Sequence, residues 1–556
     1  MRRARLLQTG VAVVLAGGAL AAFRAARVVE RRLAAEVERA GAPLGLTAGR
    51  VRFGWWGPVR LEDVRLAGSG PQAATAEAVE VAWGLAGGRD PRSHVRSVRV
   101  RGLRAAPGGL SVEWPEASFS VVEWTRDEGR DRVRLRQAGS GGTVEGDWSA
   151  AARSGTLALA GLDLSAARVS WHGEAVLDPG RWSGRLTLRR QGERMESAGD
   201  LAGEGVRVAL PRALGLGSGA YGAPTAAALG WDLWRERDAI EVRRASARLA
   251  GLELDGHGRL GGPGARDMDL ELSGRSDLGA AFGTTGLVLP ASLPALPPAR
   301  LGEVTFAVAA HGPPGDPAAL RVEPRLQFAP APEAVRAFQF LRAPFRYVPD
   351  DAPGQAIQVG PGAPSFIALE EVPPLFVRAL LISEDAGFFG HPGIDVAEIP
   401  VAWAENEERG TSARGASTIT QQLVKNLFLS RDKSYGRKLT EAALALMVDA
   451  AVPKSRLLEI YLNVIEWGPG LHGLGPAADH YFGKAPPALT VKEMAFLICL
   501  IPSPVRYHQA HLAGHPGPGM DLLMANLLAK LHSVGALSDA EYDDAMEEEL
   551  AFAPEG

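Results

Sequence analysis

Two neighbouring carboxylates, Glu384 and Asp385, end an apolar segment and precede a turn of glycine, histidine and proline that reaches Gly393. A carboxylate that is desolvated near aromatic side chains has a raised pKa, which suits a general base. Taken alone, the same residues also describe a solvated helix end followed by a turn.

A second cluster, RGASTITQQLVKN, runs from Arg414 to Asn426. Thr418 and Gln421 have the spacing of a capping box, which predicts that a helix starts here. Free backbone N–H groups at a helix start favour anions, and hydroxyl, amide and lysine side chains add donors for phosphate oxygens. The simpler interpretation is a well-capped helix without a ligand.

Two further clusters follow. Arg437 and Glu441 are four residues apart in RKLTE, so we expect them on one helical face, where a surface ion pair contributes about 0.3–0.5 kcal/mol. The segment 454–463, KSRLLEIYLN, has the pattern of an amphipathic helix whose apolar residues belong in a core.

In this order and spacing, the four clusters resemble the peptidoglycan glycosyltransferase family, which occurs in bifunctional penicillin-binding proteins and in monofunctional transglycosylases. The resemblance runs from about Pro373 to Pro504. It also includes the glycine-rich stretch 463–475, His480–Lys484, Leu489–Glu493 and Pro502–Pro504.

The resemblance implies that Glu384 is the general base that takes the proton from the 4-hydroxyl of the acceptor sugar. It implies that Glu441 is the second essential carboxylate, which orients groups or helps bind a divalent metal, Mg²⁺ or Mn²⁺; no organic cofactor is expected. The positions matched to substrate binding and to its positioning are Asp385, Phe388, His391, Ser417, Thr418, Gln422, Lys425, Asn426, Arg437 and Lys438. Glu459, Tyr461 and Asn463 match a structural motif that supports the cleft.

The implied reaction is polymerisation of lipid II into β-1,4-linked glycan with inversion at the anomeric carbon and release of undecaprenyl diphosphate. Lys425, Arg437 and Lys438 would stabilise the leaving diphosphate. Only about fifty residues follow Pro504, so we expect no transpeptidase domain and expect cross-linking by partner transpeptidases or other cell-wall proteins. Ala416, where many members have glycine, and the acidic link 398–413 depart from the family pattern.

The long middle region alternates apolar and polar residues in short runs, which predicts half-buried strands with Gly, Asp and Pro in the turns. The runs that we assign are Val51–Phe53, Val59–Leu66, Val79–Trp83, Val95–Val100, Thr156–Leu159, Arg168–Trp171, Gly184–Leu188, Ile240–Leu249, Leu252–Leu260 and Met268–Leu272. The texture of this region resembles AsmA-like periplasmic proteins and would imply a role near lipids or envelope assembly. A β-rich spacer or a partner-docking module is the equal alternative.

The N-terminus carries arginines before a largely apolar run from Leu6 to Phe23, long enough to span a hydrocarbon core. We interpret it as an uncleaved anchor helix, with a signal peptide as the rival interpretation. The catalytic region would then lie on the periplasmic side of a bacterial inner membrane as part of a single-pass protein.

The whole chain of 556 residues is too long for one core. We predict a multidomain protein: an anchor over 1–33, a β-rich region over 34–335 and an all-helical, lysozyme-like glycosyltransferase domain over 336–556. A formal net charge of −4 gives no basic field for nucleic acid. The lone Cys499, in an apolar run, is expected in the core.

Other functions remain open at this stage. Two carboxylates would also serve a lysozyme-like hydrolase or lytic transglycosylase, although the cationic clusters favour a diphosphate donor. A degenerate transferase attached to an envelope scaffold is the non-enzymatic alternative, against which the intact Glu384 and Glu441 argue. The GPGLHG sequence at 468–473 spells a dinucleotide motif, but Pro469 and the expected helical surroundings disfavour that interpretation.

Overall fold

The computed structural model describes residues 27–35, 37–39, 46–53, 57–66, 74–84, 94–106, 110–149, 151–171, 174–209, 222–237, 239–261, 267–285, 289–290, 293, 300–313, 316, 319–349, 354–409, 415–429 and 435–554. The predicted anchor over residues 6–23 lies outside these ranges and stays a prediction. Within them, no helix combines the length and the apolar character needed to cross a membrane.

The chain forms two compact units, one rich in strands and one mainly helical. The first comprises Met1–Gly274, Thr284–Gly286 and Ala310–Pro314, and the second comprises Arg275–Gly283, Leu287–Ala309 and Gly315–Gly556. A β-rich region followed by a helical C-terminal part is therefore confirmed.

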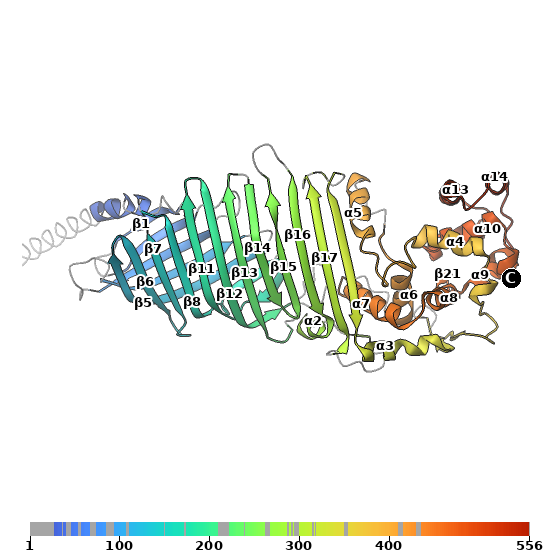
Figure 1. The fold of residues 1–556 in the computed structure, drawn as a ribbon, viewed down its shortest axis with the longest axis horizontal. Helices are drawn as coiled ribbons and strands as arrows, with labels where there is room; N and C mark the ends of the chain where they lie inside the picture. The colour runs from blue at the N-terminus through green and yellow to red at the C-terminus, as the bar shows by residue number, and fades with distance from the viewer. Residues whose placement is uncertain are drawn as a thin grey trace, which may run out of the picture. The chain divides into compact units, whose positions relative to one another are not determined.

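The β-rich unit is built from long antiparallel strands, which Figure 1 shows side by side from β11 to β14. The strands are β1 (Leu46–Arg52), β2 (Val59–Leu66), β3 (Ala74–Trp83), β4 (Val95–Ala105), β5 (Leu110–Asp127), β6 (Arg130–Gln137), β7 (Thr143–Ser149), β8 (Ser154–Asp163), β9 (Arg168–Trp171), β10 (Glu174–Asp178), β11 (Arg181–Gln191), β12 (Arg194–Val208), β13 (Thr225–Glu236), β14 (Ala239–Leu249), β15 (Leu252–Leu260) and β16 (Met268–Asp277). The short helix α2 (Leu278–Thr285) follows β16.

Consecutive strands pair as a meander from β1 to β8, and β8 then pairs with β11, from which the meander continues to β15. Tight turns make this possible. The turn between β5 and β6 places Glu128 at φ 47° and Gly129 at φ 77°, the left-handed conformations that a two-residue hairpin turn requires.

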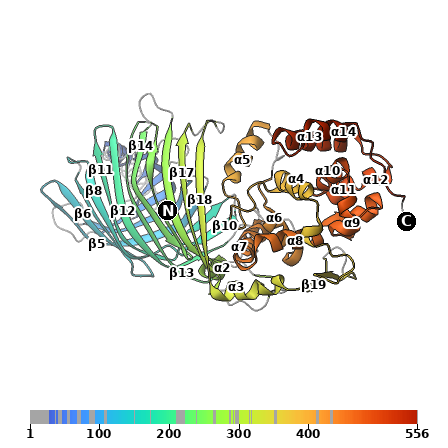
Figure 2. The same ribbon diagram turned by 45° about the vertical axis from the view of Figure 1, so that its right-hand side comes forward.

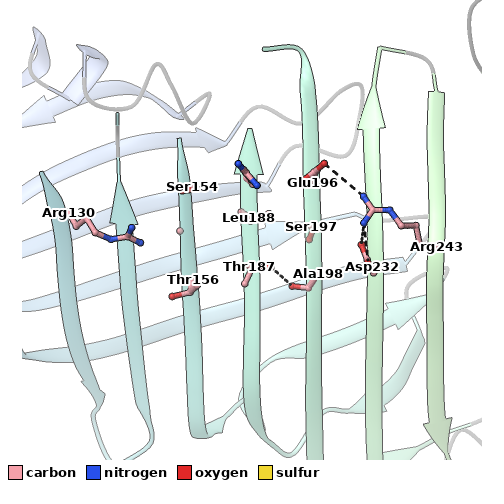
Figure 3. A pocket seen from close by; sticks show the side chains of 12 residues that line it. Arg130, Ser154, Thr156, Thr187, Leu188, Glu196, Ser197, Ala198, Asp232 and Arg243 are labelled. Atoms are coloured by element: carbon pink, nitrogen blue, oxygen red, sulfur yellow. Dashed lines mark hydrogen bonds and ion pairs between the residues drawn. The ribbon is translucent and has the colours of Figure 1, made fainter. Parts of the chain in front are cut away.

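The two faces of the sheet differ in chemistry because side chains alternate along each strand. On one face, charged residues pair across neighbouring strands, as in Arg134 with Glu145 at 2.6 Å. Figure 3 shows a shallow hollow on this face, where Arg243 on β14 lies 3.4 Å from Asp232 and 3.9 Å from Glu196. The opposite face includes the buried Trp182, which packs with Val206 and Ala227.

The predicted strands all overlap observed strands, with Val59–Leu66, Arg168–Trp171 and Leu252–Leu260 matching at both ends. Among β1 to β16, the prediction left β5, β6, β7, β10, β12 and β13 unassigned. In β6 and β12 the polar positions are occupied by charged residues and the apolar positions by few large side chains, so the apolar signal is weak. The resemblance to AsmA-like proteins stays a prediction.

The helical unit begins at Arg275 and includes most of α2. It continues through strands β17 (Gly302–Gly312) and β18 (Arg321–Pro330) into helices around one large core. Its helices are α3 (Pro332–Phe338), α4 (Pro374–Glu384), α5 (Glu398–Arg409), α6 (Ile419–Phe428), α7 (Tyr435–Ala451), α8 (Lys454–Val464), α9 (Leu474–Phe482), α10 (Val491–Leu500), α11 (Pro504–Tyr507), α12 (Gln509–Leu512), α13 (Pro518–Ser533) and α14 (Asp539–Glu547). Helix α6 packs against α7 and α8, while α10 packs against α4 and α13 (Figure 2).

The helix start predicted at Thr418 and the amphipathic helix predicted over residues 454–463 are observed as α6 and α8. The predicted burial of Cys499 is confirmed, and burial raises the pKa of its thiol to about 12, which makes it a poor nucleophile. The GPGLHG sequence forms the turn of a small hairpin, β21 (Glu466–Gly468) with β22 (Leu471–His472), rather than a strand–helix phosphate loop.

Candidate functional site

A cavity of about 820 Å³ lies within the helical unit and gathers the predicted carboxylates and cations. Of the predicted residues, those that line it are Glu384, Asp385, Ser417, Thr418, Gln422, Lys425, Arg437, Lys438 and Glu441. They come from the end of α4, the segment before α6, α6 itself and the start of α7, so segments far apart in the sequence converge on one space.

Glu384 is the last residue of α4 and is half-buried at the cavity wall. Its Oε2 accepts a hydrogen bond of 2.8 Å from the side-chain amide of Gln422, and its Oε1 accepts one of 3.4 Å from the hydroxyl of Ser383. Burial raises the pKa of Glu384, and the donors from Gln422 and Ser383 oppose that rise. The predicted direction of the pKa shift is therefore confirmed, and a raised pKa suits a carboxylate that acts as a general base.

Asp385 connects the first cluster to the helix of the second. Its buried carboxylate accepts the backbone N–H of Ile419 at 2.9 Å through Oδ2, and its Oδ1 lies 2.9 Å from His391 Nε2, with the ring nitrogen as donor. A carboxylate at the first turn of a helix also interacts favourably with the helix dipole. Asp385 thus fixes Glu384, its chain neighbour, relative to α6.

The start of α6 is a capping box, as predicted. The Thr418 hydroxyl accepts from the Gln421 backbone N–H and the Gln421 side chain accepts from the Thr418 N–H, while the Thr418 hydroxyl donates to Gly393 O at 2.6 Å. Gly393 has φ 86°, and a Cβ there would lie 2.5 Å from Ala445 O, so glycine is required. The anion at this helix start is the carboxylate of Asp385, which accepts the Ile419 N–H.

Glu441 on α7 is the centre of a buried charged cluster. It is 2% exposed, and its Oε2 lies 2.8 Å from Arg437 while its Oε1 accepts from Lys438. Lys438 also donates to the Ser417 hydroxyl at 2.8 Å. The predicted Arg437–Glu441 pair is confirmed, but it is not a surface pair, because the Glu441 carboxylate is buried. Removing one partner of a buried ion pair is strongly destabilising, because it leaves the other charge buried without compensation.

This arrangement leaves one net positive charge among Glu441, Arg437 and Lys438, with the Lys438 side chain 42% exposed toward the cavity that it lines. Lys425, which is exposed on α6, lines the same cavity and adds a second positive charge. The cavity lining also contains the carboxylates Asp395, Glu398 and Glu405, so the groups in it that suit a dianionic leaving group such as diphosphate are these cations.

Three other predicted residues, Asn426, Phe388 and His391, contact residues that line the cavity or lie beside it. Asn426 donates to Gln422 O at 2.9 Å. Phe388 is buried, with the Lys454 ammonium 4.4 Å from its ring centroid. That ammonium also lies 2.6 Å from Asp449. Burial raises the pKa of the Asp449 carboxyl, and the charge of Lys454 opposes that rise. His391 acts through Asp385, as described above.

Four further charged residues line the cavity: Asp395, Glu398, Glu405 and Lys530. The acidic link 398–413 was noted in the sequence without being placed at the site, whereas Asp395 and Lys530 were missed. Asp395 and Glu398 have the capping-box spacing of a helix start, and Asp395 accepts the N–H of Ala397 at 3.0 Å. That spacing was a usable signal for α5. Lys530 on α13 donates to Ile382 O at 2.7 Å and reaches the cavity from a segment that none of the four clusters included.

The predicted metal was tested against the donors present. In the parts of the chain that the structure describes, no group of three His, Cys, Asp or Glu residues is arranged to hold a metal ion. Both oxygens of Glu441 already bind cationic side chains. The divalent metal therefore stays a prediction, and no step is derived through a metal.

Comparisons with known proteins agree with the position of this cavity. Residues 355–516 match the Transglycosylase family. A biosynthetic peptidoglycan transglycosylase of Rhodopseudomonas palustris is 42% identical over 173 residues, covering 30% of this chain and 71% of that protein. Another, of Nitrosomonas eutropha, is 43% identical over 146 residues, covering 26% of this chain and 59% of that protein.

The chain spans 59 to 62% of the length of three biosynthetic peptidoglycan transglycosylases that it matches, including the one from Nitrosomonas eutropha. Among solved structures, penicillin-binding protein 1A from Haemophilus influenzae is similar with a TM-score of 0.20 and 19% identity, covering 38% of this chain and 21% of that one, which is too little to support an argument. The sequence relatives, the family match and the convergence of the motif residues on one cavity show that this chain belongs to the transglycosylase family.

Proposed function

We propose that the chain is a peptidoglycan glycosyltransferase that polymerises lipid II into β-1,4-linked glycan strands. The observation that carries the proposal is a half-buried Glu384 with a raised pKa in the same cavity as the cations Lys425, Arg437 and Lys438. The names of the relatives, biosynthetic peptidoglycan transglycosylases, agree with this substrate class.

The reaction follows from where charge develops. Glu384 takes the proton from the acceptor's 4-hydroxyl as that oxygen forms a bond to the anomeric carbon of the donor. The carbon–oxygen bond to the diphosphate breaks on the opposite face, its electron pair leaves with undecaprenyl diphosphate, and the configuration inverts. Lys425, Arg437 and Lys438 stabilise the developing negative charge, with Glu441 holding the last two in place.

The location of the enzyme is part of the proposal. The substrate carries a polyprenyl tail, so the cavity has to work at a membrane surface. We propose that the apolar run over residues 6–23 anchors the chain in the bacterial inner membrane with the helical unit on the periplasmic side. Transpeptidases that cross-link the new strands would be its natural partners.

The direct test of the site supplies lipid II to the full-length chain and to Glu384→Gln, with glycan polymer separated on a gel. Loss of a general base typically lowers the rate by about 10²–10⁴-fold, so the variant should form almost no polymer. Glu370→Gln, an exposed carboxylate outside the cavity, is the matched control and should polymerise normally. Normal polymer from Glu384→Gln would remove the proposed base.

A further inference from the structure

A buried tyrosine stands behind the proposed base. Tyr461 on α8 donates its hydroxyl to Gln422 Oε1 at 2.8 Å, and Gln422 Nε2 donates to Glu384 Oε2 at 2.8 Å. Three side chains from α8, α6 and α4 therefore form one directed chain of hydrogen bonds that ends on the proposed catalytic carboxylate.

The members of this chain are held by their surroundings. Tyr461 is completely buried among the core residues, and burial together with the nearby Glu384 and Asp385 charges raises its pKa well above its ordinary value. It therefore remains a donor throughout the pH range in which the enzyme works. Gln422 is fixed by its backbone, whose N–H donates to Thr418 O at 2.9 Å and whose carbonyl accepts from Asn426.

The direction of the chain matters because an amide has two different ends. With Oε1 held by the Tyr461 hydroxyl, Nε2 faces Glu384 and favours its ionised form. If the amide turned over, Oε1 would face the carboxylate, favour the protonated form and raise the pKa of Glu384. A phenol can also accept a hydrogen bond, so what favours the first state is that the Tyr461 proton then has Gln422 Oε1 as its acceptor, 2.8 Å away.

We propose that Tyr461 is a positioning residue for the transfer reaction: its hydroxyl holds the Gln422 amide with Nε2 toward Glu384, which keeps the base ionised and fixes its Oε2. The other oxygen, Oε1, has the longer contact with Ser383 and is the one that receives the acceptor's proton. This assignment rests on the proposed function, and it gives Gln422 a role on the enzyme's base rather than on the substrate's phosphate.

The test measures kcat/KM for lipid II polymerisation as a function of pH for the wild type and Tyr461→Phe in the full-length chain. Without the phenol the Gln422 amide is free to turn. The acid limb of the pH profile of kcat/KM should therefore move to higher pH by about one unit, with near-normal rates on the alkaline side. A tyrosine that only supports the fold would lower the rate by the same factor at every pH, and that result would overturn the proposal.

Tyr481→Phe is the matched control. This tyrosine is also buried in the helical unit. Its hydroxyl donates to Trp467 O at 2.9 Å and lies 2.9 Å from His508 Nδ1, and neither partner lines the cavity. Removing the hydroxyl takes away at least as much buried hydrogen bonding and should leave the position of the acid limb unchanged. A shift of equal size in this variant would show that the effect is a general loss of packing and would contradict the proposal.

Gln422→Leu keeps the assignment testable if Tyr461→Phe does not fold. It removes the link itself, so the acid limb of its pH–rate profile should also move upward. Where Tyr461→Phe does fold, combining the two substitutions should cause no further shift. An unmoved limb in Gln422→Leu, or a further shift in the double variant, contradicts the relay. If the wild type forms no polymer, the proposed function fails instead, and the two failures are distinct.

Discussion

At the scale of single residues, the site depends on hydrogen bonds between side chains and backbone groups that lie far apart in the sequence. Glu384 could be recognised as a base candidate because a carboxylate at the end of an apolar segment is readily desolvated. The links from Asp385 to the Ile419 N–H and from Tyr461 to Gln422 could not be predicted, because each joins segments more than thirty residues apart. Such contacts depend on how helices pack, which local patterns do not specify.

The raised pKa of Glu384 predicts a specific pH dependence. The base must be ionised, so activity should be lost as pH falls through its raised pKa, and the acid limb should lie above the ordinary glutamate value of about 4.3. The sign for stability is opposite: folding favours the protonated form, so the stabilisation is present at low pH and lost as pH rises. We therefore expect Glu384→Gln to raise the melting temperature at neutral pH, measured beside the pH–rate profile. A melting temperature that falls would contradict this account of its burial.

At the scale of elements, helix starts were the most predictable features. The capping box at Thr418 was predicted from two residues three apart, and the same device begins α10 and α14. The position of α5 along the cavity was not predicted, because an acidic helix is more often exposed to solvent than part of a site. The outcome depends on tertiary packing that brings Glu398 and Glu405 to the cavity.

Thr418→Val tests whether the start of α6 positions the site. It removes the cap and leaves the Gly393 carbonyl without its donor, so we expect a loss of about 1–3 kcal/mol in unfolding free energy, together with slower polymerisation. Circular dichroism at increasing denaturant and the polymer assay measure the two effects.

Ser538→Ala is the comparison, because it removes an equivalent capping box from the terminal helix α14, away from the cavity. It should cost about 1 kcal/mol and leave polymerisation unchanged. If both variants slowed polymerisation equally, the effect would be one of general stability rather than of α6.

At the scale of the whole molecule, the division into a β-rich and a helical part was readable from the change in periodicity. The strands that were missed show the limit of that approach. Alternation is clearest when apolar positions carry large side chains, whereas β12 places Gly199 and Gly203 opposite the indoles of Trp231 and Trp182. The apolar side chains there belong to the neighbouring strands β11 and β13, so the sequence of β12 alone does not show that this strand is partly covered.

Trp182→Ala tests whether the β-rich unit has a core of its own. Trp182 is 8% exposed and its indole N–H donates to Pro179 O at 2.6 Å, so its removal should cost about 3–5 kcal/mol in that unit. In calorimetry, we expect a lower melting transition for the β-rich unit and an unchanged one for the helical unit. Trp83→Ala, at a position 44% exposed, should shift neither by more than about 0.5 kcal/mol. A shift of the helical transition in Trp182→Ala would refute separate cores.

The central claim is that the cavity builds glycan rather than cleaves it. The most direct measurement gives the full-length chain lipid II in one reaction and a preformed glycan strand in another, and follows the glycan length in both. The account predicts long glycan and released undecaprenyl diphosphate from the first reaction, with no shortening in the second. Shortened strands in the second reaction without polymer in the first would contradict it and would identify a glycan-cleaving enzyme.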